Sequence, residues 1–150
     1  MDIKDFLSPA DALVDLRAPD KVWLIHDLSR RAAASLKLDA ELISKAILAR
    51  EELGSTGMGG GVAIPHARIP DLKKPFGILA CLKKPIGFDA IDTRAIDVVV
   101  FLLLPSDASP EHLHALATVA RALRNPDLVA KLRRARGGTE AYRCIAGAGR

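Results

Sequence analysis

The order of apolar and polar residues predicts two amphipathic helices in the first third of the chain. The first has Asp20 as its N-cap. The second begins at Asp39 and ends at Gly54, since a left-handed glycine commonly closes a helix. Apolar residues spaced three and four apart define the buried side of each helix. They are Val22, Ile25, Leu28, Ala32 and Leu36 in the first helix, and Leu42, Ile43, Ala46 and Ile47 in the second, with Leu53 as a further candidate.

Three short apolar runs predict strands, at residues 62–64, 76–82 and 96–104. The last run is apolar at almost every position, which is typical of a strand that is buried on both faces of a sheet. Helices must therefore cover both faces of this sheet.

Three more helices are expected near the C-terminus, starting at Pro110, Pro126 and Thr139. The length of 150 residues is that of about one domain. The sequence therefore predicts the α/β class, with residues 1–150 forming a single layered domain in which a mixed β-sheet is flanked by helices on both faces.

Composition and charge argue against several classes of function. The net charge is +4, but only 4% of the residues are aromatic, so the basic and aromatic face of a nucleic-acid binder is not predicted. Cys81 and Cys144 have no second Cys or His at ligand spacing, which argues against a metal site and against a disulfide framework. The longest apolar run, residues 98–104, is too short to cross a bilayer, and the acidic N-terminus is unlike a secretory signal. We expect a cytoplasmic protein without metal or cofactor.

A glycine-rich segment, residues 55–61, invites comparison with nucleotide-binding loops. A Walker loop requires Lys and then Ser or Thr after its last glycine, whereas Gly59 is followed by Gly60. A dinucleotide-binding fingerprint leads from a strand into a helix, whereas this segment leads from a helix into a strand. A flexible surface connection is the ordinary interpretation. However, the following strand ends at Pro65-His66, so we expect the glycine amides to lie near His66, where they could bind a phosphoryl group.

Two histidines have positions that suit phosphate chemistry. His66 follows a buried strand, and a neutral imidazole nitrogen is a good nucleophile for phosphoryl transfer. His112 falls in the first turn of the helix that begins at Pro110, where free amides and the helix dipole stabilise a phosphate. Helical phasing groups His112 with apolar residues, whereas His114 lies on the polar face. A lone histidine at such a position is more often structural than reactive, so the residues alone leave both interpretations of His66 open.

The run from Arg50 to His66, REELGSTGMGGGVAIPH, resembles the signature of the fructose- and mannitol-type enzyme IIA domains of the bacterial phosphoenolpyruvate-dependent phosphotransferase system. Met58 stands where this family commonly has isoleucine. The resemblance continues through Leu104-Pro105 and Glu111-His112-Leu113 and covers nearly the whole chain. Within the family, the chain is most similar to the stand-alone nitrogen-regulatory enzyme IIA proteins.

This resemblance implies a phosphotransferase with a phosphohistidine intermediate. It implies that His66 accepts a phosphoryl group from an HPr-type phosphocarrier protein, that His112 is a second active-site histidine, and that Arg50 is a nearby cation. The residues themselves leave two roles open for Arg50. Its guanidinium suits phosphate oxygens, but it could equally be an ordinary i,i+4 partner at a helix end.

Two uses of the phosphohistidine follow from the resemblance. The first is regulation, in which the phosphorylation state reports nitrogen or carbon status to target proteins such as kinases or transporters. The alternative is a sugar-specific enzyme IIA component that passes the phosphoryl group to a separate IIB component or permease during carbohydrate uptake. We expect the first, with no nucleic-acid partner and no membrane insertion.

Overall fold

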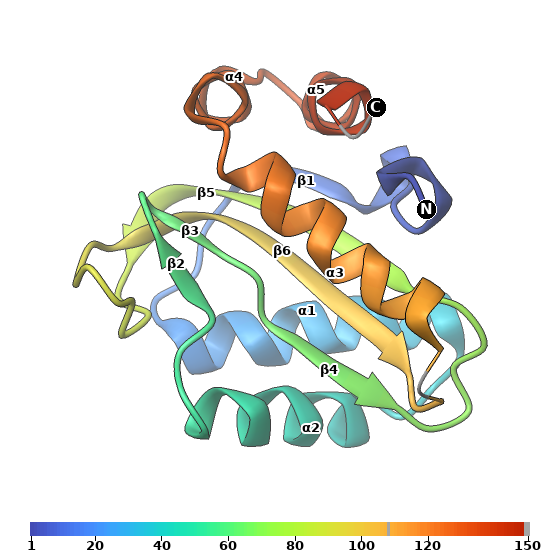
Figure 1. Cartoon of the computed structure of the whole chain (residues 1–150). Helices are drawn as coiled ribbons and strands as arrows, with labels where there is room; N and C mark the ends of the chain where they lie inside the picture. Colours follow the sequence, from blue (N-terminus) through green and yellow to red (C-terminus); the bar gives the residue numbers. More distant parts are fainter. Residues whose placement is uncertain (108, 149–150) are drawn as a thin grey trace.

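A mixed β-sheet with helices on both faces forms the framework of the protein (Figure 1). The computed structural model describes residues 1–107 and 109–148. The strands are β1 Ala12–Leu16, β2 Gly57–Gly59, β3 Val62–Ala63, β4 His66–Ile69, β5 Phe76–Ile86 and β6 Ile96–Pro105. The helices are α1 Lys21–Leu36, α2 Ala40–Glu52, α3 Pro110–Leu123, α4 Pro126–Arg134 and α5 Gly138–Ala148. Two short 3-10 helices, Ile3–Asp5 and Pro9–Asp11, precede β1.

The longest strands, β5 and β6, run antiparallel to each other, and the other strands add to their outer edges. β1 lies parallel to β5, whereas β3 and β4 both lie parallel to β6. β3 pairs with Val98 and Val99, and β4 pairs with β6 from Leu102 onward. Between β3 and β4, the carbonyl oxygen of Pro65 accepts a hydrogen bond from the Leu102 amide at 2.9 Å. His66 therefore begins a strand whose position is set by the most deeply buried strand of the sheet.

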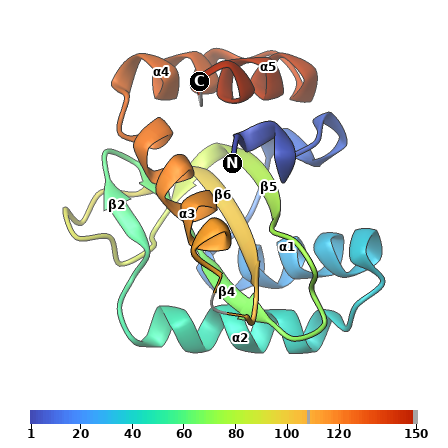
Figure 2. The same cartoon turned by 45° about the vertical axis from the view of Figure 1, so that its right-hand side comes forward.

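Side chains of β6 alternate between two helical layers. Val98, Val100, Leu102 and Leu104 belong to the core beneath α3, α4 and α5, whereas Val99, Phe101 and Leu103 belong to the core above α1 and α2. Figures 1 and 2 show these two helical layers on opposite faces of the sheet. None of these seven side chains is more than 3% exposed. The predicted fold class, a mixed sheet flanked by helices on both faces, is confirmed.

Polar caps set the beginnings of α1 and α2. The Asp20 carboxylate accepts a hydrogen bond from the Trp23 amide at 2.8 Å, which confirms Asp20 as the N-cap of α1. Asp39 accepts one from the Glu41 amide at 3.0 Å and caps α2 in the same way. Over the described parts of the chain, no helix has both the length and the apolar character needed to cross a membrane.

Three apolar residues that were expected on buried helix sides are exposed instead. α2 ends at Glu52, so Leu53 lies beyond the helix and is 86% exposed. Val22 and Leu42 are 51% and 42% exposed. Leu42 is adjacent in sequence to the fully buried Ile43, and one residue of an α-helix turns the side chain by about 100°, away from the core.

The hydrophobic pattern does not predict β1, β2 or β4. β2 contains two glycines and β4 two polar residues, and both compositions are unfavourable for strands in isolation. The segment at 55–61, expected to be a flexible loop, instead contains β2 and the turn of an antiparallel hairpin with β3. Pairing with longer neighbours therefore creates strands that local sequence does not indicate.

Candidate functional site

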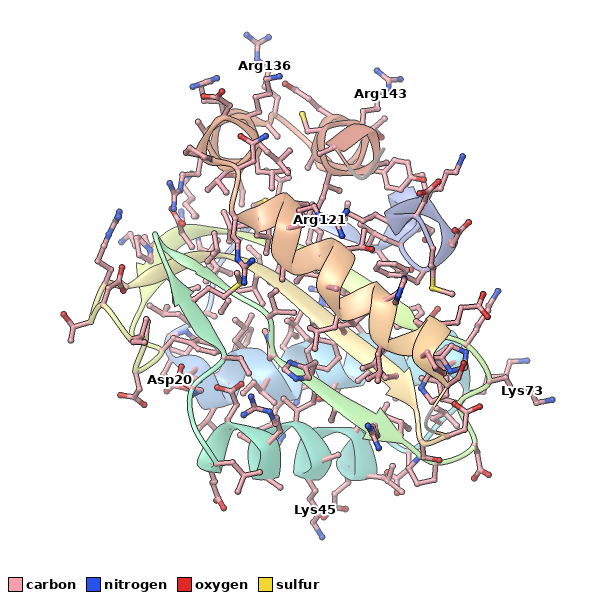
Figure 3. The ribbon with its side chains drawn as sticks, viewed as in Figure 1. Asp20, Lys45, Lys73, Arg121, Arg136 and Arg143 are labelled. Carbon is pink, nitrogen blue, oxygen red and sulfur yellow. The ribbon has the colours of Figure 1, made fainter. Side chains whose placement is uncertain are left out.

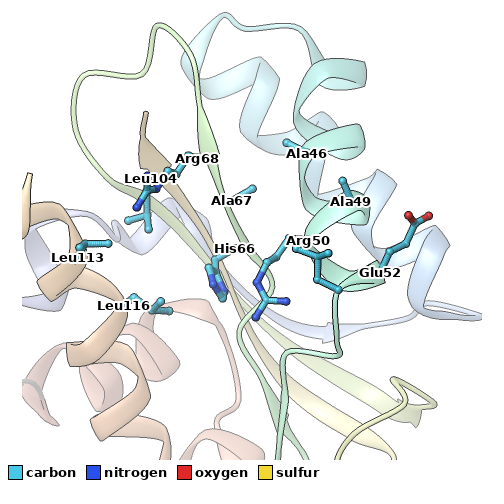
Figure 4. Close-up of a pocket in the computed structure, with 11 residues that line it drawn as sticks. Ala46, Ala49, Arg50, Glu52, His66, Ala67, Arg68, Leu104, Leu113 and Leu116 are labelled. Atoms are coloured by element: carbon cyan, nitrogen blue, oxygen red, sulfur yellow. The ribbon is translucent and has the colours of Figure 1, made fainter. Parts of the chain in front are cut away.

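An open cavity of about 660 Å³ lies where α2, β4 and α3 meet (Figure 4). It is lined by Ala46, Ala49, Arg50, Glu52, Leu53, His66, Ala67, Arg68, Leu104, Leu113 and Leu116. Figure 4 shows the side chains of His66 and Arg50 next to each other, with Leu113 and Leu116 on the α3 side. Two of the three predicted site residues, His66 and Arg50, therefore meet in a largely apolar depression.

The local backbone fixes the proton position on the half-buried His66 imidazole. The carbonyl oxygen of Ile64 lies 2.7 Å from Nδ1 of His66. Because a carbonyl can only accept a hydrogen bond, Nδ1 carries the hydrogen and donates it. Pro65, whose ring fixes φ, connects these two residues and restricts their relative position. In the neutral ring, Nε2 therefore keeps its lone pair and is the nucleophilic atom.

Burial lowers the pKa of His66 below its ordinary value. The positive charge of Arg50 lowers this pKa further, whereas the hydrogen bond to the Ile64 carbonyl and the charge of Glu51 act in the opposite direction. The net result is that the neutral imidazole predominates at neutral pH. This is the form that can attack a phosphorus atom.

Two arginines bring positive charge to the cavity. Nη1 of Arg50 donates a hydrogen bond to the Gly54 carbonyl at 2.9 Å, which anchors this side chain at the end of α2. Arg68 lies two residues after His66 in β4, so the two side chains project from the same face of the strand. Arg68 makes no side-chain hydrogen bond or ion pair with any described residue. Glu52 points away from His66 in Figure 4, so the surroundings of His66 favour an anion.

A buried network connects the end of α2 to the segment that leads to His66. The Glu51 side chain is 4% exposed and forms an ion pair with Lys21, whose Nζ lies 2.8 Å from Oε1. The Glu51 carboxylate also accepts hydrogen bonds from the amide of Thr56 and from its hydroxyl. The Thr56 carbonyl in turn accepts a hydrogen bond from the Ile64 amide at 3.1 Å. The network therefore reaches the residue that orients the His66 ring.

The expectation that glycine amides lie beside His66 is wrong. The glycine-rich segment forms a hairpin, and the described residues that line the His66 cavity include none of its glycines. The Gly60 amide instead donates to the carboxylate of Asp92 at 2.9 Å. Glycine is needed here for packing and for turn geometry. A Cβ atom at Gly57 would lie 2.7 Å from that of Ala90, and Gly60 has a φ of +67°.

His112 lies in the first turn of α3, as predicted, but it is not among the described residues that line the His66 cavity. Its Nδ1 lies 2.8 Å from a carboxylate oxygen of Asp107, and its side chain is 15% exposed. The next residue, Leu113, does line the cavity. His114 is exposed to solvent, so the different exposure of the two histidines agrees with the helical phasing.

Sequence reasoning did not identify Arg68, Glu51 or Asp107 as parts of this region. The alternation of side chains along a strand would have placed Arg68 beside His66 if β4 had been predicted. In the sequence, Glu51 could be recognised only as one of two adjacent acidic residues at the end of a helix. Asp107 lies in the connection before α3, where no periodic pattern indicates which side chain it meets.

Comparisons with known proteins agree with this architecture. Residues 5–147 match the family model described as "Phosphoenolpyruvate-dependent sugar phosphotransferase system, EIIA 2". The chain is 38% identical over 146 residues to a nitrogen regulatory protein of Bradyrhizobium diazoefficiens, covering 97% of this chain and 95% of that protein. It is 31% identical over 139 residues to a PTS system fructose-specific EIIA component of Haloferax volcanii, covering 88% of each. The crystal structure of nitrogen regulatory protein IIA-Ntr from Neisseria meningitidis superposes with a TM-score of 0.90 at 29% identity, covering 95% of this chain and 98% of that one.

Proposed function

Because this chain belongs to the EIIA type 2 family of the phosphoenolpyruvate-dependent sugar phosphotransferase system, we propose that it is a histidine phosphocarrier that regulates target proteins through its phosphorylation state. The acceptor is His66. The observation that carries this assignment is the hydrogen bond from Nδ1 to the Ile64 carbonyl, since it leaves the lone pair on Nε2. The similarity to nitrogen regulatory proteins along almost the whole chain supports the regulatory part of the proposal.

The transfer step is a displacement at phosphorus. Nε2 of His66 attacks the phosphoryl group carried by a histidine of an upstream HPr-type phosphocarrier protein. A bond forms between Nε2 and phosphorus, and the bond between phosphorus and the donor nitrogen breaks. The electron pair of that bond returns to the donor ring, whose other nitrogen carries a hydrogen, so the donor leaves as a neutral imidazole. His66 keeps the hydrogen on Nδ1, and the Ile64 carbonyl stabilises the positive charge that develops on the phosphorylated ring.

The arginines of the cavity offset the charge of the transferred group. Arg50 and Arg68 both line the His66 cavity, and a guanidinium donates several hydrogen bonds in a planar arrangement that matches phosphate oxygens. Fixed positive charge in a partly buried site stabilises the transition state and the phosphohistidine together.

His112 assists through its position near the start of α3. Asp107 accepts a hydrogen bond from Nδ1 of His112 and fixes the orientation of the ring. The imidazolium form of the ring, which carries a hydrogen on each nitrogen, can then also donate from Nε2 to a phosphoryl oxygen. Because His112 lies outside the lining of the free cavity, it contributes when the donor protein is bound and the phosphoryl group lies between the two proteins.

Apolar side chains around the cavity form the surface on which the donor protein docks. Leu53 is 86% exposed and Leu113 is 45% exposed, and both line the His66 cavity. Exposed apolar side chains that flank a reactive group are typical of a protein–protein contact surface. A small-molecule phosphate donor would not need such a contact surface.

A sugar-specific role is the second candidate function. It is supported by the similarity to a fructose-specific EIIA component, at lower identity than the similarity to the nitrogen regulatory protein. In that role, His66 would pass its phosphoryl group to a separate IIB component. The regulatory role requires instead that target proteins distinguish the two phosphorylation states.

The experiment compares the proteins that each form binds. Unphosphorylated and phosphorylated protein are immobilised, incubated with cell extract, and the bound proteins are identified by mass spectrometry. The regulatory role predicts a target that binds one form and is released from the other, with binding that weakens as salt is added. His66→Ala protein treated with the phosphorylating system should behave as the unphosphorylated form. Identical sets of bound proteins for both forms would contradict regulation and favour the sugar-specific role.

A further inference from the structure

A second cavity, of about 360 Å³, lies at the turn of the β2–β3 hairpin. We call it the hairpin cavity. It is lined by Met58, Gly59, Gly60, Val62, Arg94, Leu123, Arg124, Pro126, Val129 and Arg133. Figures 1 and 2 show the hairpin turn close to the junction of α3 and α4. None of the residues that line it also lines the cavity of His66, so this is a separate place on the described part of the chain.

One of its three arginines has a structural role. Nε of Arg133 lies 3.0 Å from each carboxylate oxygen of Asp97, and Nη2 donates to the Gly60 carbonyl at 2.8 Å. Arg133 therefore joins α4 to β6 and to the hairpin turn, and forms a fixed wall of the hairpin cavity.

The other two arginines are available for a ligand. Arg94 and Arg124 are exposed, and their side chains make no hydrogen bond or ion pair with any described residue. The nearby carboxylate of Asp92 already accepts hydrogen bonds from the amides of Gly60 and Arg94. An unpaired guanidinium at the wall of a cavity is a favourable partner for a phosphate or carboxylate group.

The charge of the hairpin cavity differs from that of other cavities in the described chain. Cavities beside the N-terminal segment, between α4 and α5, and at the start of α2 each combine Lys or Arg with Asp or Glu in their lining. The lining of the hairpin cavity contains three arginines and no acidic side chain, and of the three only Arg133 is paired with a carboxylate of a described residue, that of Asp97. The positive charge of the residues that line this cavity therefore indicates an anionic ligand.

The floor of the hairpin cavity is apolar. Val62, Leu123 and Val129 are each at most 4% exposed, and Met58 packs against the same core. Met58 is partly exposed, whereas the other three side chains present only a small area to the cavity. An apolar body beside the anionic group would therefore contact mainly Met58.

We propose that the hairpin cavity binds a small organic anion in which a phosphate or carboxylate group is attached to an apolar body. The anionic group contacts Arg94 and Arg124, and the apolar body lies on the floor of Met58, Val62, Leu123 and Val129. The site is distinct from the phosphoryl acceptor, and its occupancy does not depend on the function proposed for His66.

The test uses phenyl phosphate and benzoate as probes, with phenol as the uncharged control, in titrations followed by amide NMR shifts. The two anions distinguish a phosphate ligand from a carboxylate ligand. We expect at least one of them to give saturable shifts at Gly59, Gly60 and Val62. Arg94→Gln and Arg124→Gln should each weaken its binding about tenfold, which is the usual effect of losing one hydrogen bond between charged groups. Arg121→Gln, an exposed α3 arginine outside the cavity (Figure 3), should not.

A salt titration of the unsubstituted protein gives an independent measurement, since anion binding to arginines should weaken as salt is added. Several results would overturn the proposal. They are the absence of saturable shifts at the hairpin with either anion, shifts confined to His66 and its neighbours, equal binding of phenol, and unchanged binding in both arginine variants.

Discussion

The surroundings of His66 disfavour the cationic imidazolium form of its ring and favour a negatively charged group beside it. Burial and the positive charge of Arg50 lower the pKa of the ring, so the cationic imidazolium is disfavoured before transfer. In the proposed function, the same guanidinium, together with that of Arg68, would stabilise the dianionic group after transfer. The arginines of this cavity would then act on His66 both before and after transfer, without any change in their own charge.

Arg50→Gln should raise the pKa of His66. The substitution removes a positive charge that disfavours the imidazolium, while the burial of the ring remains. The measurement is a pH titration of the His66 ring signals by NMR. Lys45→Gln, which removes a charge from the exposed side of the same helix (Figure 3), is the matched control.

The pH dependence of phosphoryl acceptance should change in the same direction. Acceptance requires the neutral ring and is lost as the pH falls through the pKa of His66. Arg50 contributes to the lowered pKa of His66 in the unsubstituted protein, so this pKa is higher in Arg50→Gln. As the pH falls, the loss of acceptance should therefore begin at a higher pH in the variant. An unchanged or lowered His66 pKa in Arg50→Gln would show that Arg50 does not act on the ring.

His112→Ala should slow phosphoryl acceptance on the order of 10²–10³-fold without abolishing it, because one hydrogen-bond donor to the transferred group is lost while the nucleophile remains. Rapid-quench measurements of phosphorylated protein against time give the rate. His114→Ala removes an exposed histidine from the same helix turn and should leave the rate unchanged. Equal losses in the two variants would indicate that helical phasing misassigned the roles of these histidines.

At the scale of elements, the link between α2 and the hairpin positions the site. Arg50 lies in the last turn of α2, and the adjacent Glu51 is held by Lys21 and Thr56. A charged side chain as buried as that of Glu51 is stable only when its oxygens are paired. The last turn of α2 cannot move relative to Thr56 without breaking these contacts, so Arg50 keeps its place beside His66.

Thr56→Val should destabilise the protein by about 1–3 kcal/mol, because it removes a hydroxyl donor and leaves a buried carboxylate oxygen less well paired. Urea denaturation gives the change in the free energy of unfolding. Amide hydrogen exchange at Gly54 and Thr56 should also become faster, since the last turn of α2 is loosened.

Thr139→Val is the control for this substitution, since Thr139 is exposed on α5 and the same change of shape there removes no buried contact. Equal stability of the two variants would contradict the importance of the link between α2 and the hairpin.

The predictability of an element from sequence depended on where its stabilising contacts lie. β6 and the five helices carry their own patterns of apolar residues, so their presence was predicted from local sequence. β2 and β4 exist because they pair with β3 and β6, which is information that no local window contains. The error about the glycine amides has the same origin, because an unrecognised hairpin was treated as a loop beside His66.

The site was predictable only in part for a related reason. His66 and Arg50 are separated in sequence, and the resemblance to a family, not periodicity, indicated that they belong together. The partner of Arg133 shows the general difficulty, since Asp97 lies 36 residues earlier in the chain. Side-chain pairs of this kind depend on the packing of α4 against the sheet edge, which sequence spacing does not encode.

For the whole molecule, phosphorylation is a large change in charge at one place. The net charge is +4, and a phosphoryl group adds about −1.5 to −2 at neutral pH. The group would be attached within a rim of exposed leucines and beside two arginines, so the docking surface around His66 changes from basic to nearly neutral or acidic while the fold is retained.

The most direct test of the central claim is to identify the atom that carries the phosphoryl group. The protein, labelled with ¹⁵N in its histidines, is incubated with phosphoenolpyruvate and the upstream phosphotransferase components, and the phosphohistidine is examined by ¹⁵N and ³¹P NMR. We predict one phosphoryl group, on Nε2 of His66, and none in His66→Ala. A phosphoryl group on Nδ1 of His66, or on another histidine, would contradict the assignment that rests on the hydrogen bond from Nδ1 to the Ile64 carbonyl.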